Sequence, residues 1–145
     1  MYETITGTSK ADLITNYGYN VTIDGGAGAD IIENSGSNVT IDAGDGNDYI
    51  YNTAANVSIN GGKGNDTIEI SSWGTNPENV IQYAAGDGND VVEFINKPLS
   101  GSSLLIELTS GTLCATSITD DGDILLQVGS NYLRTGVHKR LSIFQ

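Results

Sequence analysis

The chain has 145 residues, of which 19 are glycine and one is cysteine, and its formal net charge is −12. Such a chain forms one or two small domains, has no partner for an internal disulfide, and carries an acidic surface that repels nucleic acid and anionic lipid. No apolar run is long enough to span a membrane, no stretch has the period and capping signals of a long helix, and the N-terminus lacks the basic and apolar regions of a cleavable signal peptide. We therefore expect an all-β protein.

Nine-residue segments rich in glycine and aspartate recur at a fixed spacing. The sequence GGAGADIIE begins at Gly25, AGDGNDYIY at Ala43 and GGKGNDTIE at Gly61, and a degenerate copy, GTSKADLIT, begins at Gly7. These starts are 18 residues apart, and a fixed short period is typical of a solenoid whose repeats stack around a common core. An ordinary hairpin protein would also contain DG and NG turns, but it gives no reason for a constant period.

The residues between these glycine loops form a second pattern, in which NYGYNVTID begins at Asn16, NSGSNVTID at Asn34 and NTAANVSIN at Asn52. Alternation in VTI and VSI places Val and Ile on one face of a strand. We predict a parallel β-roll with 18 residues per coil, each coil having two short strands and two turns. Its core would consist of Val21, Ile23, Ile32, Val39, Ile41, Ile50, Val57, Ile59 and Ile68. Stacked asparagines, Asn16/Asn34/Asn52 and Asn20/Asn38/Asn56, would join the coils along one edge through their amides or, alternatively, recognise ice or sugar.

Each glycine loop has an aspartate in its sixth place. Glycines permit a tight turn that leaves carbonyl oxygens unpaired, and stacked strands lie about 4.8 Å apart, so the aspartates would repel one another unless a cation lay between them. A hard cation with six to eight oxygen ligands meets this need, and Ca²⁺ does so better than Mg²⁺. The aspartates are Asp12, Asp30, Asp48, Asp66 and Asp90, on the edge opposite to the asparagines.

A further loop, AGDGNDVVE from Ala85, follows Gly61 by 24 residues instead of 18. We expect the six extra residues to lie in the half of the coil without a glycine loop. There, SSWGTNPENV at 71–80 would bulge out, and the strand would resume at 81–83 in parallel with the earlier ones. Trp73 would cover the end of the core or, alternatively, stack on a ligand.

Beyond Phe94 the glycine pattern ends. Apolar runs at 103–108, 112–118, 123–128 and 131–137 are separated by SG, DDGD and GS turns, which is typical of a short antiparallel sheet. Because an open end of a solenoid exposes its core and unpaired backbone, we divide the chain into a β-roll at 1–96 and a C-terminal β capping segment at 97–145. Cys114 is expected to be a small buried residue of a strand. No serine or cysteine has the partners of a catalytic triad, so we expect no enzymatic activity.

The glycine loops resemble the RTX, or haemolysin-type, repeat GGxGxDxUx, a calcium-binding parallel β-helix motif in which U is a large apolar residue. The resemblance covers roughly residues 7–93. It implies that Ca²⁺ binds between coils through backbone carbonyls of the first four places and through the sixth-place aspartate. The implied ligands are Asp12; Gly25, Gly26, Ala27, Gly28 and Asp30; Ala43, Gly44, Asp45, Gly46 and Asp48; Gly61, Gly62, Lys63, Gly64 and Asp66; and Gly86, Asp87, Gly88 and Asp90. Lys10 replaces the fourth-place glycine of the first loop, and Ala43 and Ala85 replace first-place glycines.

RTX repeats imply a secreted bacterial protein that stays unfolded in the calcium-poor cytosol, passes through a type I secretion apparatus and folds in extracellular calcium. We therefore expect a non-catalytic folding and export module that binds about three to four Ca²⁺ ions. The ions would lie between Asp12 and Asp30, between Asp30 and Asp48, between Asp48 and Asp66 and, as the fourth, between Asp66 and Asp90. An upstream domain of the same larger protein is an expected partner. One alternative is a surface adhesin, glycan-binding or ice-binding module that uses the flat Asn/Thr face with Thr22, Thr40 and Ser58; the other is an accessory module of an enzyme.

Overall fold

The computed structural model describes residues 2–71, 79–95, 104–118, 123–136 and 141–144. These residues form fifteen β-strands and contain no helix, and hence no helix that could cross a membrane. The first ten strands are β1 (Glu3–Thr6), β2 (Leu13–Asn16), β3 (Val21–Asp24), β4 (Ile31–Asn34), β5 (Val39–Asp42), β6 (Tyr49–Asn52), β7 (Val57–Asn60), β8 (Thr67–Ile70), β9 (Val80–Tyr83) and β10 (Asp90–Phe94). The last five are β11 (Leu104–Leu108), β12 (Leu113–Ile118), β13 (Ile124–Val128), β14 (Asn131–Thr135) and β15 (Leu141–Phe144).

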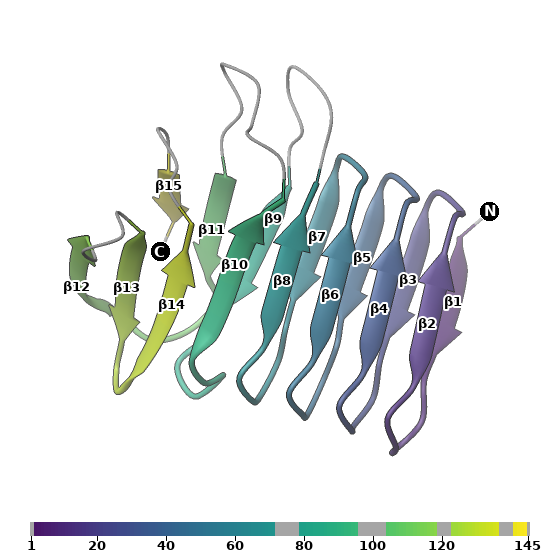
Figure 1. The fold of residues 1–145 in the computed structure, drawn as a ribbon, viewed down its shortest axis with the longest axis horizontal. Coiled ribbons are helices and arrows are strands. Elements are labelled where there is room, and N and C mark those ends of the chain that lie inside the picture. Colours follow the sequence, from purple (N-terminus) through teal and green to yellow (C-terminus); the bar gives the residue numbers. More distant parts are fainter. Residues whose placement is uncertain (1, 72–78, 96–103, 119–122, 137–140, 145) are drawn as a thin grey trace.

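From β1 to β12, successive strands alternate between two stacked sheets as the chain winds from coil to coil (Figure 1). The seven-stranded sheet has the order β1-β3-β5-β7-β9-β11-β15, and the eight-stranded sheet has the order β12-β13-β14-β10-β8-β6-β4-β2. All strand pairs are parallel except those that join β12, β13 and β14. The predicted all-β parallel roll with an antiparallel C-terminal portion is therefore confirmed.

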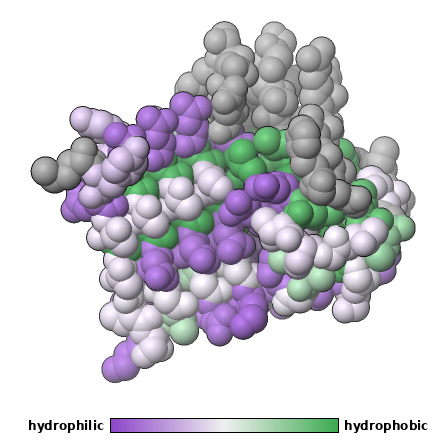
Figure 2. All heavy atoms as spheres, turned by 180° about the vertical axis from the view of Figure 1, so that it is seen from behind, coloured by the Kyte–Doolittle hydropathy of each residue, from purple (hydrophilic) through white to green (hydrophobic). Residues whose placement is uncertain are grey.

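The core is a file of like residues between the two sheets. Ile14 lies opposite Ile32 and Ile32 opposite Ile50 in one sheet, and Ile23 lies opposite Ile41 in the other. Each VTI strand buries its first and third residues and exposes the second, as strict alternation requires. All nine residues of the predicted core are buried. Outward residues also form rows, and Figure 2 shows hydrophilic side chains aligned across successive coils on one face.

The asparagine edge is built as the sequence predicts. The Nδ2 of Asn16 donates to Oδ1 of Asn34, and the Nδ2 of Asn34 donates to Oδ1 of Asn52, each at 2.8 Å. These three side chains are buried. The second row, Asn20, Asn38 and Asn56, is more exposed and has φ of 57–58°, a left-handed conformation that asparagine tolerates better than most residues.

The position of the six extra residues differs from the prediction. Ser58 of β7 pairs with Val80 of β9, a separation of 22, whereas Thr67 of β8 pairs with Val91 of β10, a separation of 24. Compared with the 18-residue period, four extra residues therefore precede β9 and two more lie in the connection from β9 to β10. The expectation that all six belong to the other half is wrong. The parallel strand at 81–83 is confirmed as β9, while residues 72–78, with Trp73, lie outside the described residues.

The C-terminal segment continues both sheets of the roll. β11 pairs in parallel with β9 and with β15, and β14 pairs in parallel with β10, so only the β12–β13–β14 portion is antiparallel. One hydrophobic cluster extends from Ile14 to Leu133. The division at residue 96 stays a prediction.

Cys114 is exposed, and the prediction that it is buried is wrong. The pairing of β12 with β13 shifts between Leu113 and Ala115, so Cys114 lies at a bulge that breaks the alternation of inward and outward side chains. Its Sγ lies 3.3 Å from the carbonyl oxygen of Thr112.

Candidate metal sites in the glycine loops

Five loops at one edge of the roll carry the sixth-place aspartates. We number them loop 1 (7–12), loop 2 (25–30), loop 3 (43–48), loop 4 (61–66) and loop 5 (85–90). Each loop precedes a strand of the eight-stranded sheet, and the parallel register therefore stacks one aspartate on the next.

One carboxylate oxygen of each stacked aspartate joins neighbouring coils. The Oδ1 of Asp30 accepts a hydrogen bond from the backbone N–H of Asp12 at 2.8 Å, and the Oδ1 of Asp48 accepts one from Asp30 at 2.7 Å. The same bond links Asp48 to Asp66 at 2.8 Å and Asp66 to Asp90 at 2.9 Å. The predicted alignment of the aspartates is therefore present, and the ladder includes loop 5 despite its longer spacing.

The other carboxylate oxygen is buried without a partner in three of these residues. The Oδ2 atoms of Asp30, Asp48 and Asp66 accept no hydrogen bond and are shielded from solvent. An unpaired buried polar atom costs about 1–3 kcal/mol, and more when it is charged. A bound cation would remove that cost, so these atoms fit a metal site.

The surroundings of Asp48, Asp66 and Asp90 disfavour negative charge on their carboxylates. Burial raises the pKa of Asp48, and it raises the pKa of Asp66 to about 6 and that of Asp90 to about 7, while backbone hydrogen bonds partly oppose the shift. Coulombic repulsion from the neighbouring aspartate adds to it: Asp30 acts on Asp48, Asp48 on Asp66, and Asp66 on Asp90. A cation between the coils would relieve both effects.

Backbone carbonyls supply further oxygens, but not from all places of the loops. The second-place carbonyl of Gly44 accepts a hydrogen bond from Lys63 N, and the third-place carbonyl of Lys63 accepts one from Gly46 N. Among the described residues, the first- and fourth-place carbonyls of loops 2 to 4 accept no hydrogen bond: Gly25, Ala43 and Gly61 in the first place, and Gly28, Gly46 and Gly64 in the fourth. The first and fourth places are therefore the ones that can offer a cation a free carbonyl oxygen.

The glycine positions show where these oxygens lie. A Cβ at Gly25 would be 2.4 Å from the carbonyl oxygen of Ala43 and 2.9 Å from Oδ2 of Asp30, so both oxygens face one small space. A Cβ at Gly46, where φ is +150°, would be 1.6 Å from the carbonyl oxygen of Gly28. The fourth-place carbonyl thus points toward the next coil. Ca²⁺ takes carboxylate and carbonyl oxygens of this kind. No group of three acidic, histidine or cysteine side chains that could hold a metal occurs in the described part of the chain, so an ion here would depend on carbonyls.

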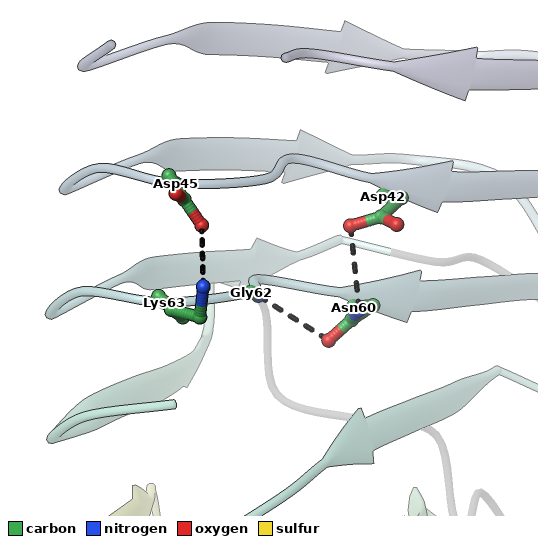
Figure 3. Close-up of polar contacts among 5 residues, drawn as sticks. All are labelled: Asp42, Asp45, Asn60, Gly62 and Lys63. Atoms are coloured by element: carbon green, nitrogen blue, oxygen red, sulfur yellow. Dashed lines mark hydrogen bonds and ion pairs between the residues drawn. The ribbon is translucent and has the colours of Figure 1, made fainter. Parts of the chain in front are cut away.

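The third-place side chains of loops 3 and 4 lie outside this row of oxygens. Figure 3 shows Lys63 beside Asp45 on the next coil, with the ammonium 3.3 Å from the carboxylate and both side chains exposed. The same view shows how the strand end fastens the loop: Asn60 donates to Asp42 at 3.3 Å and accepts from the N–H of Gly62 at 3.2 Å. An exposed ion pair contributes about 0–1 kcal/mol, so the pair of Lys63 and Asp45 adds little to the stability of the loops.

Loops 1 and 5, at the two ends of the row, differ from loops 2 to 4 in the hydrogen bonds that their oxygens accept. The sequence did not lead us to expect these bonds. In loop 1, Oδ2 of Asp12 accepts hydrogen bonds from the backbone N–H and the hydroxyl of Thr8. In loop 5, the hydroxyl of the buried Tyr83 donates to the carbonyl of Gly88. Space around the Cα of Gly86 is open, so this glycine does not stack on loop 4. Two features of the sequence could have indicated these differences: Thr8 replaces the second-place glycine of loop 1, and Tyr83 lies two residues ahead of loop 5.

Comparison with protein families identifies the repeats. The model of the RTX calcium-binding nonapeptide repeat matches four copies, at residues 6–38, 35–56 and 53–69. No curated protein matches the chain.

Proposed function

We propose that this chain, whose residues 6–69 belong to the RTX calcium-binding repeat family, is a non-catalytic module that folds when Ca²⁺ binds between its coils. The observation that carries the proposal is the row of buried, unpartnered Oδ2 atoms on Asp30, Asp48 and Asp66. If the roll folded without cations, asparagine in place of these aspartates would make it more stable. Asparagines of successive coils can hydrogen-bond to one another, as they do along the opposite edge.

Two sites are assigned three such oxygens each. Between loops 2 and 3 we assign Oδ2 of Asp30 and the carbonyl of Ala43, which face one space, together with the free carbonyl of Gly28, which points toward Gly46. By the repeat, Asp48, Gly46 and Gly61 hold the same places between loops 3 and 4. When bound, Ca²⁺ supplies the positive charge that these oxygens lack, and the chain's own contribution is to hold them in register.

A third site, between loops 4 and 5, is less complete. Oδ2 of Asp66 and the carbonyl of Gly64 are unpartnered. However, the two extra residues between β9 and β10 displace the first half of loop 5. The N–H of Asp87 donates to the carbonyl of Ala84, just ahead of the loop, and not to that of Gly62. We therefore expect weaker binding at this site than at the other two.

The binding energy is large enough to control folding. An ion that binds only the folded state stabilises it by about 2.7 kcal/mol when its concentration is 100 times the Kd. Two such ions contribute about 5 kcal/mol, which is comparable to the whole stability of a small domain. Kd values of extracellular calcium modules are about 10⁻⁴–10⁻³ M, so calcium outside a cell would supply less than the energy calculated for a 100-fold excess. It would still favour the folded roll, whereas cytosolic calcium would not. This difference supports a role in export through a type I secretion apparatus, with folding outside the bacterial cell.

The test compares calcium titrations of two variants with equal change of charge. Asp48→Asn removes a carboxylate of the row, whereas Asp24→Asn removes an outward-facing carboxylate of β3. We expect the wild type and Asp24→Asn to be largely disordered in chelator by circular dichroism, and to gain β signal on addition of Ca²⁺ much more than of Mg²⁺. The Asp48→Asn variant should need at least tenfold more calcium. A wild-type spectrum and melting temperature that chelator leaves unchanged would show that the roll folds without calcium.

A second candidate function is supported by the outer face of the seven-stranded sheet. Thr4, Thr22, Thr40 and Ser58 lie side by side in the parallel register, and the three threonines are exposed. A flat row of hydroxyls suits recognition of a glycan or of ice. Binding on a glycan array, or inhibition of ice growth, that Thr22→Val/Thr40→Val abolishes would establish it; no signal in either assay would remove it.

A further inference from the structure

We infer that Thr8 closes the row of calcium sites at its N-terminal end, by occupying the carboxylate oxygen of Asp12 that an ion between loops 1 and 2 would need. The inference rests on the proposed calcium binding, and it replaces the ion expected between Asp12 and Asp30 with two hydrogen bonds.

The first argument is the state of the carboxylate. The backbone N–H of Thr8 lies 2.6 Å from Oδ2 of Asp12 and its hydroxyl oxygen lies 2.8 Å from the same atom. The corresponding Oδ2 atoms of the next three loops have no partner. Two donors on one oxygen satisfy its two main acceptor directions. Asp12 therefore lacks the unmet need for a cation that the later aspartates have.

The second argument is the conformation of the loop. Thr8 stands in the second place, where Gly26, Gly44 and Gly62 have φ of 97°, 105° and 89°. Thr8 is not among the described residues with positive φ, which a β-branched side chain strongly disfavours. Its peptide can therefore turn its N–H toward the carboxylate. In loop 4, the N–H of the second-place Gly62 donates instead to Oδ1 of Asn60, and a glycine has no hydroxyl group.

The third argument concerns the fourth place. The N–H of Lys10 donates to the hydroxyl oxygen of Thr8 at 3.1 Å. A Cβ at Gly28 would meet the carbonyl carbon of Lys10 at 2.5 Å and its oxygen at 2.8 Å, whereas a Cβ at Gly46 meets the oxygen of Gly28 first. The carbonyl of Lys10 is thus turned aside compared with that of Gly28. Of the three oxygens that border the later sites, the carbonyl of Gly25 alone remains between loops 1 and 2.

Thr8 therefore ends the row of calcium sites at loop 2. It lets the first coil close its loop by ordinary hydrogen bonds, so that no ion is exposed at the open end of the roll. Lys10 adds a positive charge to the same loop, which further opposes a cation.

The experiment counts calcium ions by native mass spectrometry of the full chain, in wild type and in Thr8→Gly/Lys10→Gly, which restores the glycines of loops 2 and 4. Each is measured with and without Asp12→Ala, and circular dichroism verifies folding. We expect Asp12→Ala to leave the ion count of the wild type unchanged. The double glycine variant should bind one additional ion, and Asp12→Ala should remove that ion again.

Loss of one ion from the wild type on Asp12→Ala would overturn the inference, because it would show that the first site is occupied. This arm does not require the glycine variant to fold. A folded glycine variant with an unchanged count would also overturn it, since neither Thr8 nor Lys10 would then be what keeps calcium out. Asp48→Asn serves as the reference: if the wild type binds no calcium that this substitution removes, the proposed function fails, whatever the first loop does.

Discussion

The asparagine edge provides the most direct test of how the coils are held together. Asn34 is buried and makes four hydrogen bonds. Its Nδ2 donates to the carbonyl of Gly36 at 2.9 Å and to Asn52 at 2.8 Å. Its Oδ1 accepts from Asn16 at 2.8 Å and from the N–H of Gly36 at 3.2 Å. Substitution by alanine would leave partners on three coils unpaired.

The expected cost of Asn34→Ala follows from this count. At about 0.5–1.5 kcal/mol for each hydrogen bond, four bonds amount to about 2–6 kcal/mol, a large share of the roughly 5–15 kcal/mol that stabilises a small domain. With a loss of about 4 kcal/mol and an m-value of about 2 kcal/mol/M, the midpoint of urea unfolding should fall by about 2 M.

The assay is urea unfolding in saturating calcium, so that the opposite edge stays loaded. Ser37→Ala is the matched control, because Ser37 lies in the same turn and its side chain is exposed. It should shift the midpoint by less than about 0.3 M, as a surface substitution does. Equal midpoints for Asn34→Ala and Ser37→Ala would refute the reasoning, since the ladder would then contribute nothing measurable.

Two further predictions concern the glycine loops. Gly64→Ala should prevent folding at calcium concentrations that fold the wild type, because the new Cβ would lie 1.7 Å from the carbonyl oxygen of Gly46. Gly86→Ala meets no atom within 4 Å and should cost only the strain of its positive φ, about 1–3 kcal/mol. Circular dichroism in calcium shows whether each variant folds; a Gly64→Ala variant that folds with the same urea midpoint as Gly86→Ala would contradict the stacking. In metal-free buffer, the β signal should be larger at pH 5 than at pH 8. The folded-state pKa values of Asp66 and Asp90, about 6 and 7, exceed the ordinary 3.8, so this stability is present at low pH and is lost as the pH rises through those values. Asp66→Asn/Asp90→Asn should reduce the difference, and an equal or larger difference in that variant would place its origin elsewhere.

The sequence predicts the regular part of the molecule closely because each coil repeats the same local choices. Val21 and Ile23 alternate with outward residues in a strand, and the same spacing recurs 18 residues later, so strand type, register and core follow from one unit. The aspartate row follows in the same way, because parallel pairing in register fixes the neighbour of Asp30 as Asp48.

The prediction fails where the repeat changes. A spacing of 24 residues gives the size of the insertion but not its division between two turns, which depends on how β9 pairs with β7. The orientation of Cys114 depends on a bulge between β12 and β13. The role of Thr8 depends on which way one peptide group turns. Each of these three features is determined by strand pairing or by a single backbone rotation. The residue types at these positions are compatible with more than one conformation, so the sequence alone does not select among them.

The two edges of the roll show why calcium dependence can be confined to one of them. An asparagine amide both donates and accepts, so Asn16, Asn34 and Asn52 can bond to one another and to the turn backbone without help. A carboxylate only accepts. Asp48 gives one oxygen to the N–H of Asp30 and has no donor for the other, which leaves a buried charge that only a cation or a proton can neutralise. Under the proposed mechanism, folding would therefore depend on calcium at the aspartate edge alone, and a single donor placed beside an aspartate, as Thr8 is beside Asp12, would free one coil from that dependence.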